Sequence, residues 1–391
     1  MSRNVFILAL CQALAMSGTS MLIAISALVG QSLAPHPSLT TAPLAAQFIG
    51  TMVTTIPASL LMARIGRRAG FTIGQLVGVC GGATAAYGVM AGSFILVIVG
   101  TALLGVHNAF WQYYRFAAAD AAPPDMKSRA ISYVLAGGLV AAFVGPQLSK
   151  WTVDLAPAAF SASYMAVVVL CSMAIICLQF TRLKTPLKGG IEVKGRPILQ
   201  IMKSRTFVVA AMSSTIGYAV MNMLMTSTPL AMKVCGFAFA DSATVIQWHI
   251  VGMFLPSFFT GHLIKRFGVT TIIAVGAVLQ AGAVALALSG VDFHNFIGGL
   301  IFLGLGWNFM FIGGSTLLTS AYNEEERAKT QAAHDFMVFT LVAISAFASG
   351  ALHELIGWTA VNLISAVPVA IAFLAVIWYR LQPADDQTAK G

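Results

Sequence analysis

The chain is a series of long apolar segments separated by short polar stretches. An apolar run of about 20 residues is what a helix needs to cross a lipid bilayer. The first run, Val5 to Gly30, is too long to be the core of a signal peptide, so we interpret it as a span. We therefore predict an all-α polytopic membrane protein with twelve spans. The predicted spans are 5–30, 42–63, 70–91, 94–117, 129–149, 159–180, 206–232, 243–264, 269–289, 294–319, 330–351 and 358–379.

Composition supports this class, and the placement of charge predicts its orientation. Hydrophobic residues make up 58% of the 391 residues and charged residues only 9%. Nineteen of the 22 Lys and Arg residues fall on the side that holds both termini, two (Lys150 and Lys233) fall on the other, and Arg115 lies in a span. The positive-inside rule then places both termini in the cytoplasm. The net positive charge reflects this topology and contact with the bilayer, so it gives no reason to expect a nucleic-acid partner.

One long polar interruption divides the chain. Residues 181–205 are rich in Lys, Arg, Gly and Pro and separate two groups of six predicted spans. We therefore predict an N-terminal half at 1–180, a cytoplasmic linker at 181–205 and a C-terminal half at 206–391. A basic loop, Ser59 to Arg68, follows the second span, and a similar loop, Gly261 to Gly268, follows the eighth. Such internal repeats are typical of transporters whose binding site lies near the midplane, between the two halves.

The first of these basic loops resembles the signature of the major facilitator superfamily, Gly-x-x-x-Asp-Arg-x-Gly-Arg-Arg, which connects the second and third spans. Ser59 and Ala63 stand where Gly and Asp are usual, and Lys265 replaces the acid of the second copy. The resemblance implies the major facilitator fold, with twelve transmembrane helices in two six-helix halves. The matching residues are Arg64, Gly66, Arg67 and Arg68.

Ionisable side chains within the spans are candidates for function, because a charge at membrane depth is costly. The fourth span ends with Arg115 and Asp120, and the eleventh carries His334 and Asp335 about two turns from the cytoplasmic surface. One hypothesis is that these four residues form a gate or couple transport to protons. The other is that they make structural contacts. We favour the second for Arg115, Asp120 and Asp335, because side chains near the surface reach water easily.

A second set of candidates combines methionine and histidine near the midplane. Met221 and Met225 lie one turn apart in the seventh span, and His249 and Met253 have the same spacing in the eighth. Met223 points to the opposite side of its helix. Three thioethers and one imidazole form a soft ligand set that suits Cu(I) and binds Mg²⁺, Mn²⁺ or Ca²⁺ poorly. Packing is the alternative role for these methionines.

The paired motifs resemble those of the CcoA-type copper importers, a branch of the major facilitator superfamily. The stretches Tyr114 to Asp120 and Gly306 to Gly314 resemble the same branch and its relatives. The resemblance implies import of Cu(I) across a bacterial inner membrane by alternating access, to supply assembly of cbb3-type cytochrome oxidase. It also implies a cytosolic copper chaperone as a partner. Copper is the cargo, and we expect no bound cofactor. The metal ligands in this hypothesis are Met221, Met225, His249 and Met253.

A carrier of a small organic solute such as riboflavin is the alternative hypothesis, because relatives in the wider group carry such molecules. In that case the methionines are packing. Neither hypothesis is enzymatic, since the sequence shows no nucleophile with a positioned base, no phosphate-binding loop and no cofactor fingerprint. The aromatic side chains that would offer stacking surfaces are Trp111, Tyr113, Tyr114, Trp248 and Trp307.

Overall fold

The computed structural model describes residues 3–123, 127–183 and 195–382 of the chain. In this part of the chain the regular structure is helical, and no strand is present. The α-helices are α1 (Arg3–Leu33), α2 (Ala42–Ile65), α3 (Arg67–Met90), α4 (Phe94–Trp111), α5 (Tyr114–Asp120), α6 (Lys127–Thr152), α7 (Ser161–Gln179), α8 (Ile198–Met202), α9 (Arg205–Val234), α10 (Phe239–Phe254), α11 (Ser257–Phe267), α12 (Val269–Ser289), α13 (Phe293–Leu318) and α14 (Arg327–Leu381). Two short 3-10 helices are η1 (Pro37–Leu39) and η3 (Glu324–Glu326).

These helices account for all twelve predicted spans. Within the described ranges, nine helical segments are long and apolar enough to cross a membrane, with α4 and α5 together forming one of them. Helix α6 is a further span, and α10 with α11 forms another, interrupted at Leu255 and Pro256. Helix α14, at 55 residues, contains two spans joined at Gly357, whose φ of 78° is one that glycine adopts readily. The predicted fold class is confirmed.

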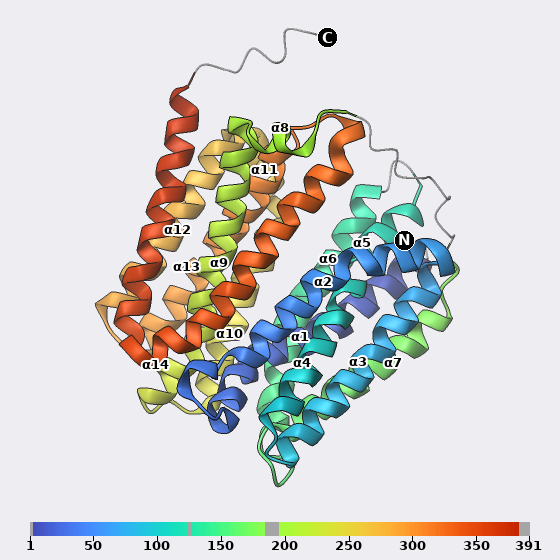
Figure 1. Ribbon diagram of the computed structural model, residues 1–391, viewed down its shortest axis with the longest axis vertical. Helices are drawn as coiled ribbons and strands as arrows, with labels where there is room; N and C mark the ends of the chain where they lie inside the picture. The colour runs from blue at the N-terminus through green and yellow to red at the C-terminus, as the bar shows by residue number, and fades with distance from the viewer. Residues whose placement is uncertain (1–2, 124–126, 184–194, 383–391) are drawn as a thin grey trace.

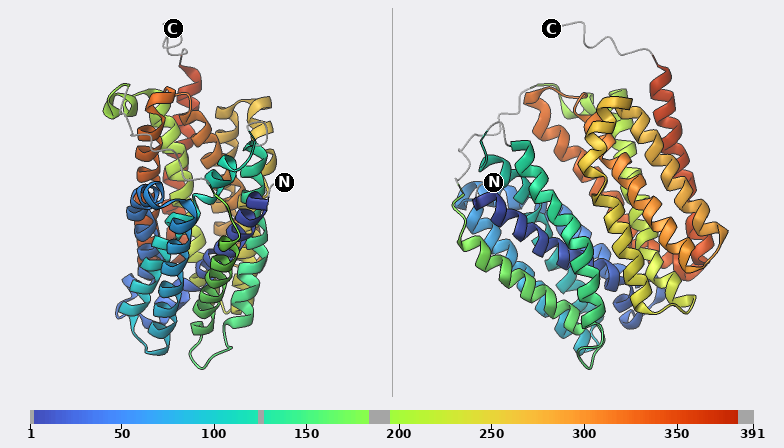
Figure 2. Two further views of the ribbon diagram at one scale, coloured as in Figure 1. Left: turned by 90° about the vertical axis from the view of Figure 1, so that its right-hand side faces the viewer. Right: turned by 180° about the vertical axis from the view of Figure 1, so that it is seen from behind.

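The spans form two bundles of six. In the first bundle, α1 packs on α6 and α3 on α4; in the second, α14 packs on α9 and α12 on α13. Figures 1 and 2 show that the bundles meet at one end of the molecule and diverge toward the end that carries α8. We refer to these as the closed end and the linker end. The exact boundaries of the halves remain a prediction, and residues 184–194 of the predicted linker lie outside the described residues.

The helix pairs that join the two bundles include α6 with α10, α2 with α14, η1 with α14, α1 with α9 and α1 with α10. Polar side chains join the bundles at the closed end. The amide of Gln147 donates to Oε1 of Gln247 at 2.9 Å, and Nζ of Lys150 donates to the Thr244 hydroxyl at 2.8 Å. Further contacts at this end are Lys233 to Gln31, Gln31 to Glu354, and Thr41 to the backbone of Phe347 and Gly350.

Glycine allows the helices of the second bundle to approach one another closely. A Cβ atom at Gly304 of α13 would lie 2.5 Å from the carbonyl oxygen of His249 in α10. A Cβ atom at Gly306 would lie 2.7 Å from the carbonyl oxygen of Gly276 in α12. Small residues at such crossings are typical of membrane helices, whose association depends on close packing. They hold α13 in the centre of the bundle, where it supports the site described below.

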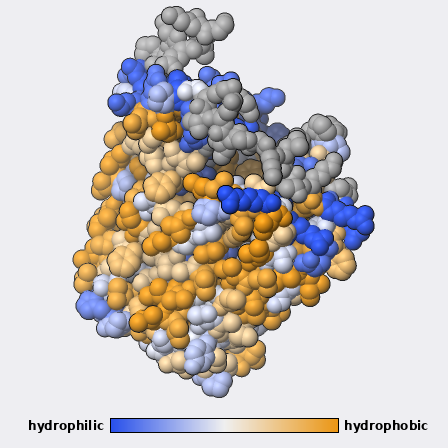
Figure 3. All heavy atoms as spheres, turned by 45° about the vertical axis from the view of Figure 1, so that its right-hand side comes forward, coloured by the Kyte–Doolittle hydropathy of each residue, from blue (hydrophilic) through white to orange (hydrophobic). Residues whose placement is uncertain are grey.

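The outer surface is suited to lipid. Large apolar side chains that would be buried in a soluble protein are exposed along the bundles, as at Ile95, Leu374 and Val53. Figure 3 shows hydrophobic residues over the sides of the molecule and hydrophilic residues gathered at the linker end. This distribution agrees with a protein that spans a membrane with the linker end at one surface.

Linker residues that follow the gap in the description are fixed to the second bundle. Glu326 is almost completely buried, and Oε2 accepts from Nη2 of Arg196 at 2.7 Å while Oε1 accepts from Nε of Arg196 at 2.9 Å. The backbone N–H groups of Arg196 and Asn323 also donate to this carboxylate, at 2.7 and 3.0 Å. These donors, Arg196 first, lower the pKa of Glu326 to about 2. We call this contact the linker anchor.

Candidate functional site

The eighth span is broken at the level of the site, and one asparagine holds the break together. Helix α10 ends at Phe254 and α11 begins at Ser257, after Pro256, which has no N–H to donate. Asn308 of α13 replaces the missing contacts. Its Nδ2 donates to the Met253 carbonyl at 2.6 Å and to the Ser257 hydroxyl at 2.7 Å. Its Oδ1 accepts from the Thr260 hydroxyl at 2.6 Å. The break is therefore a fixed feature of the bundle.

Five aromatic side chains gather beside this break, and we call them the aromatic cluster: Tyr218 of α9, Phe254 of α10, Trp307 and Phe311 of α13, and Phe339 of α14. The rings of Trp307 and Phe311 are stacked, with centroids 5.2 Å apart and an angle of 8° between their planes. Tyr218 meets both edge-on, at 5.3 Å from Trp307 and 5.4 Å from Phe311. Phe254 and Phe339 complete the cluster, at 6.1 Å from Trp307 and 6.3 Å from Tyr218.

Three of the four helices that carry the cluster, α9, α10 and α14, contact the first bundle. Phe254 reaches across the boundary, because a Cβ atom at Gly138 of α6 would meet its ring at 3.2 Å. Tyr218, Phe254, Phe311 and Phe339 are each only partly buried. The indole N–H of Trp307 is buried and has no hydrogen-bond partner among the described residues. A buried donor without an acceptor is costly, so this N–H is available to a ligand that carries an acceptor.

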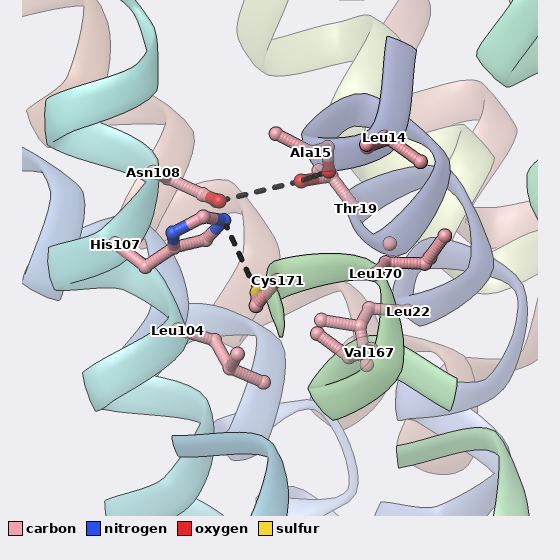
Figure 4. Close-up of a pocket in the computed structure, with 11 residues that line it drawn as sticks. Leu14, Ala15, Thr19, Leu22, Leu104, His107, Asn108, Val167, Leu170 and Cys171 are labelled. Carbon is pink, nitrogen blue, oxygen red and sulfur yellow. Dashed lines mark hydrogen bonds between the residues drawn. The ribbon is translucent and has the colours of Figure 1, made fainter. Parts of the chain in front are cut away.

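The first bundle presents an oriented amide from α4. Oδ1 of Asn108 accepts from the indole N–H of Trp111 at 2.9 Å and from the Thr19 hydroxyl of α1 at 3.3 Å. These two donors fix the amide, so its Nδ2 group points away from them. Figure 4 shows Asn108 and Thr19 at one end of a cavity of about 10 Å³ between α1, α4 and α7. A cavity of that size holds one water molecule.

A histidine and a cysteine line the same small cavity. Nδ1 of His107 lies 3.1 Å from the Gly74 carbonyl, which accepts its hydrogen. Nε2 is then the acceptor, and it faces the thiol of Cys171 at 4.0 Å, as Figure 4 shows. Both side chains are buried. This pair belongs to the packing of the first bundle.

The structure buries all four residues of the predicted metal site. Met221, Met225 and Met253 belong to one large hydrophobic cluster, and each is less than one tenth exposed. Nδ1 of His249 donates to the Leu300 carbonyl of α13 at 2.7 Å, and its Nε2 is buried without a partner among the described residues. Helix α10 packs chiefly on α13 and α6, and less on α9, so the two pairs of residues are not on helices that run side by side along their length.

Met223 makes a contact of its own with α14. Its sulfur accepts a hydrogen bond from the Ser365 hydroxyl in the last part of α14, at 3.7 Å. Met221 and Met225 are buried in the large hydrophobic cluster, and Met223 packs against the same cluster from a partly buried position. The contact with Ser365 agrees with a different direction for the Met223 side chain, and its separation from the other two methionines stays a prediction.

The predicted gate residues divide into two groups. Asp120 is exposed and pairs with Arg67 of the same bundle, with Oδ2 2.7 Å from Nη2. Arg115 of α5 and Asp335 of α14 belong to opposite bundles, and the charge of Asp335 acts on Arg115. His334 is buried, with Nδ1 3.1 Å from Oδ1 of Asp335. The contact of Asp120 with Arg67 agrees with the structural interpretation, and the role of each of the four residues stays a prediction.

Of the aromatic residues predicted to stack on an organic solute, only Trp307 belongs to the aromatic cluster. Trp307 is at the centre of the aromatic cluster, and Trp111 orients Asn108. Tyr114 is buried in the first bundle, where its hydroxyl accepts from Gln75 at 2.7 Å, and Tyr113 donates to the Thr55 carbonyl at 2.9 Å. Trp248 is 42% exposed and faces Phe143 instead.

Sequence reasoning missed Tyr218, Phe254, Phe311, Phe339 and Asn108. The i, i+4 spacing of Trp307 and Phe311 was the available signal, since it places both rings on one face of a helix.

Comparisons with known proteins agree with this architecture. The family model described as Major Facilitator Superfamily matches residues 8–248 and 242–391. The riboflavin transporter RfnT of Brucella anthropi is 42% identical over 384 residues, which cover 97% of this chain and 96% of that protein. The uncharacterized MFS-type transporter YddS of Bacillus subtilis is 28% identical and covers 91% of this chain and 86% of its own. The nucleoside transporter NupG, in a crystal structure of a mutant form, has a TM-score of 0.74 at 14% identity, over 96% of this chain and 99% of that one.

The copper hypothesis is wrong in the light of these relatives. A protein 42% identical over nearly the full length is named for riboflavin, and the similarity therefore supports the small organic solute. Neither copper as cargo nor a copper chaperone as partner has support, and the assignment to the copper-importing branch falls with them. No finding tests whether Met221, Met225, His249 and Met253 can bind a metal. Their burial in an apolar cluster agrees with packing.

The twelve spans, the two bundles, the match of the family model to nearly the whole chain and the full-length relatives all agree. The chain is a member of the major facilitator superfamily, a multi-pass membrane transporter.

Proposed function

We propose that the protein carries a small planar organic solute, with riboflavin as the leading candidate, across a bacterial inner membrane. The observation that carries the proposal is the aromatic cluster. Three of its four helices, α9, α10 and α14, contact the first bundle, four of the five rings are partly exposed, and Trp307 offers an unused N–H. The similarity to a riboflavin transporter over 97% of the chain supports the same class of solute.

The chemistry of a flavin fits this set of groups. An isoalloxazine ring is flat, apolar on its faces and rich in carbonyl and imine acceptors at its edge. Aromatic contacts contribute about 0.5–1.5 kcal/mol each beyond the burial of surface. We propose that Tyr218 contacts the face of the ring, while the N–H of Trp307 and the amide of Asn108 donate to its edge.

Alternating access follows from the two bundles. By the positive-inside rule the linker end is cytoplasmic, with both termini on that side. The bundles diverge at that end and are joined by polar contacts at the other, which supports our inference that this is an inward-open state. In the outward-open state the two bundles must approach each other at the linker end. We propose that Arg115 of the first bundle and Asp335 of the second then pair, with His334 orienting the carboxylate.

Uptake in whole cells tests the proposal. Bacteria that lack their own riboflavin synthesis and import should grow on low external riboflavin when they express this protein, and they should accumulate labelled riboflavin. Excess unlabelled riboflavin should compete, whereas Cu(I) should not. If the protein is present in the membrane but gives neither growth nor accumulation, riboflavin is not the solute.

A further inference from the structure

A polar cavity at the linker end of the first bundle lies away from the aromatic cluster. It has a volume of about 340 Å³ and lies between the start of α1, the start of α3, the end of α5 and the segment after α7. Its polar wall consists of Asn4, Arg67, Asp120 and Arg182, and the rest is mainly small apolar residues at the end of α5. We propose that this cavity binds a phosphate group with a single negative charge, supplied by the headgroup of an anionic phospholipid.

The charges in the wall leave room for one anion. Among the described residues of the wall, Arg67 and Arg182 are positive and Asp120 is negative, so one positive charge remains uncompensated in this set. Asp120 occupies Nη2 of Arg67 at 2.7 Å, while Nη1 is buried without a partner among the described residues. The guanidinium of Arg182 has no acceptor in the described part of the chain, and its side chain is exposed. A phosphodiester carries one negative charge, and guanidinium groups bind phosphate oxygens through paired N–H donors.

The backbone of Arg182 is held in place by hydrogen bonds, although Arg182 lies in the first part of the polar linker. The side chain of Asn4 makes two hydrogen bonds to the backbone of Arg182. Nδ2 donates to the Arg182 carbonyl at 2.9 Å, and Oδ1 accepts from the Arg182 N–H at 3.0 Å. The preceding Thr181 is buried, and its hydroxyl donates to the Leu178 carbonyl at 2.7 Å. The start of α1 and the end of α7 therefore hold Arg182 at the cavity before any ligand binds.

The surroundings favour a lipid over a free phosphate ion. The cavity lies where three transmembrane helices begin or end, which is the depth of the headgroups. Phe6, two residues after Asn4, is 57% exposed, and Phe116, four residues before Asp120, is 42% exposed. Apolar side chains exposed beside a basic cavity suit a ligand with acyl chains. Clusters of Lys and Arg next to transmembrane helices attract anionic lipids in the same way.

Binding of defined lipids to the purified full-length protein tests the proposal. In an uncharged detergent, native mass spectrometry would compare short-chain phosphatidylglycerol with phosphatidylcholine of the same chain length. We expect tighter binding of phosphatidylglycerol and a higher unfolding temperature when it is present. Arg182→Gln should weaken that binding about fivefold, the size expected when one basic residue near the surface is lost. Arg182→Lys, which keeps the charge, should weaken it less.

Arg68→Gln is the matched control, because Arg68 is an exposed arginine beside Arg67 that does not line the cavity. It should leave phosphatidylglycerol binding within a factor of about two, since a charge outside the site contributes little. Equal weakening by Arg68→Gln and Arg182→Gln would overturn the site, because it would indicate only general surface charge. Equal binding of the two lipids would exclude recognition of the anion. Displacement of phosphatidylglycerol by millimolar glycerol 1-phosphate or inorganic phosphate would assign the cavity to a soluble phosphate.

Discussion

Trp307 combines two properties that a single substitution can separate, the flat face of its ring and the N–H at its edge. Trp307→Phe keeps an aromatic face but removes the donor, and Trp307→Leu removes both. We expect riboflavin affinity to fall about five- to tenfold in the first variant, the loss of about 1 kcal/mol for one hydrogen bond. Trp307→Leu should lower the riboflavin affinity further than Trp307→Phe does, because it also removes the aromatic ring that stacks on Phe311 in the cluster. Riboflavin fluorescence, which stacking quenches, gives the dissociation constants.

Trp151→Leu is the control for this pair, because Trp151 is 71% exposed and lies outside the cluster. Its affinity should equal that of the parent protein. Should Trp307→Leu bind riboflavin as tightly as Trp151→Leu, the aromatic cluster is not the binding site.

Met221 and Met225 provide a second test at this scale. If they are packing, Met221→Leu and Met225→Leu should each retain riboflavin transport and should destabilise the protein by less than about 1.5 kcal/mol, because leucine nearly conserves the volume of methionine. Met223→Leu, on the other side of α9, is the matched comparison. Transport assays and thermal unfolding in detergent give both quantities. A complete loss of transport in Met221→Leu and Met225→Leu, but not in Met223→Leu, would show that Met221 and Met225 have a functional role.

The behaviour of single residues shows where sequence reasoning reaches its limit. Helical spacing directs Met223 away from Met221 and Met225, because the step of about 100° per residue is local geometry. The ligand hypothesis additionally required α9 and α10 to run side by side, which spacing does not determine. In the structure α10 packs chiefly on α13 and α6. For the same reason the cluster around Trp307, drawn from four helices, could not be assembled from the sequence.

Among the elements, the broken span α10–α11 depends on one side chain. Asn308→Ala removes three hydrogen bonds at the break and leaves the Met253 carbonyl without its donor. We expect a loss of about 2–4 kcal/mol of stability, since buried polar groups would lose their partners. Asn295→Ala, at the exposed start of the same helix, should cost less than about 1 kcal/mol. Thermal unfolding of both variants measures the difference. Equal costs would mean that Asn308 does not hold the break.

The linker anchor predicts a dependence of stability on pH. The pKa of Glu326 is lowered from 4.5 to about 2, so the folded state favours the charged carboxylate. Its contribution is present above about pH 4.5 and is lost as the pH falls toward 2. Arg196 is 30% exposed, so water screens the pair and we expect a contribution of about 1–2 kcal/mol. Unfolding midpoints measured from about pH 7 to about pH 3 should fall more for the parent than for Glu326→Gln. Parallel curves would contradict this account of the anchor.

At the scale of the whole molecule, alternating access requires the closed end to open. The side-chain amides of Gln147 and Gln247 meet at 2.9 Å, so cysteines at these two positions should be within reach of a bifunctional methanethiosulfonate reagent, which forms a disulfide with each thiol and holds the bundles together there. Transport should stop on cross-linking and return on reduction, with Cys80 and Cys235, the exposed native cysteines, replaced by serine. A cysteine at Gln147 alone is the control and should be insensitive to the reagent. Continued transport by the cross-linked protein would exclude opening at this end.

The number of spans and their division into two groups could be read from the sequence, because each follows from composition over about 20 residues. The pairing of helices could not. Some spans that follow one another in the chain, such as α12 and α13, pack closely, whereas others, such as α9 and α10, share few contacts, and bundle geometry depends on glycines such as Gly304 that meet a distant backbone. One nearly full-length relative, named for riboflavin, supports the small organic solute over the copper that the soft ligand set had suggested.

The contacts at the closed end bear on how the cell keeps its proton gradient. A carrier that connected both compartments at once would let protons leak and dissipate stored energy. Gln147 meets Gln247 through amides, and the Thr41 hydroxyl meets backbone groups of α14, so neither contact gains or loses a proton between about pH 5 and pH 8. Acidification of the medium within that range would therefore not loosen these two contacts, and at these two points the barrier between the compartments should hold whether the surroundings are acidic or neutral.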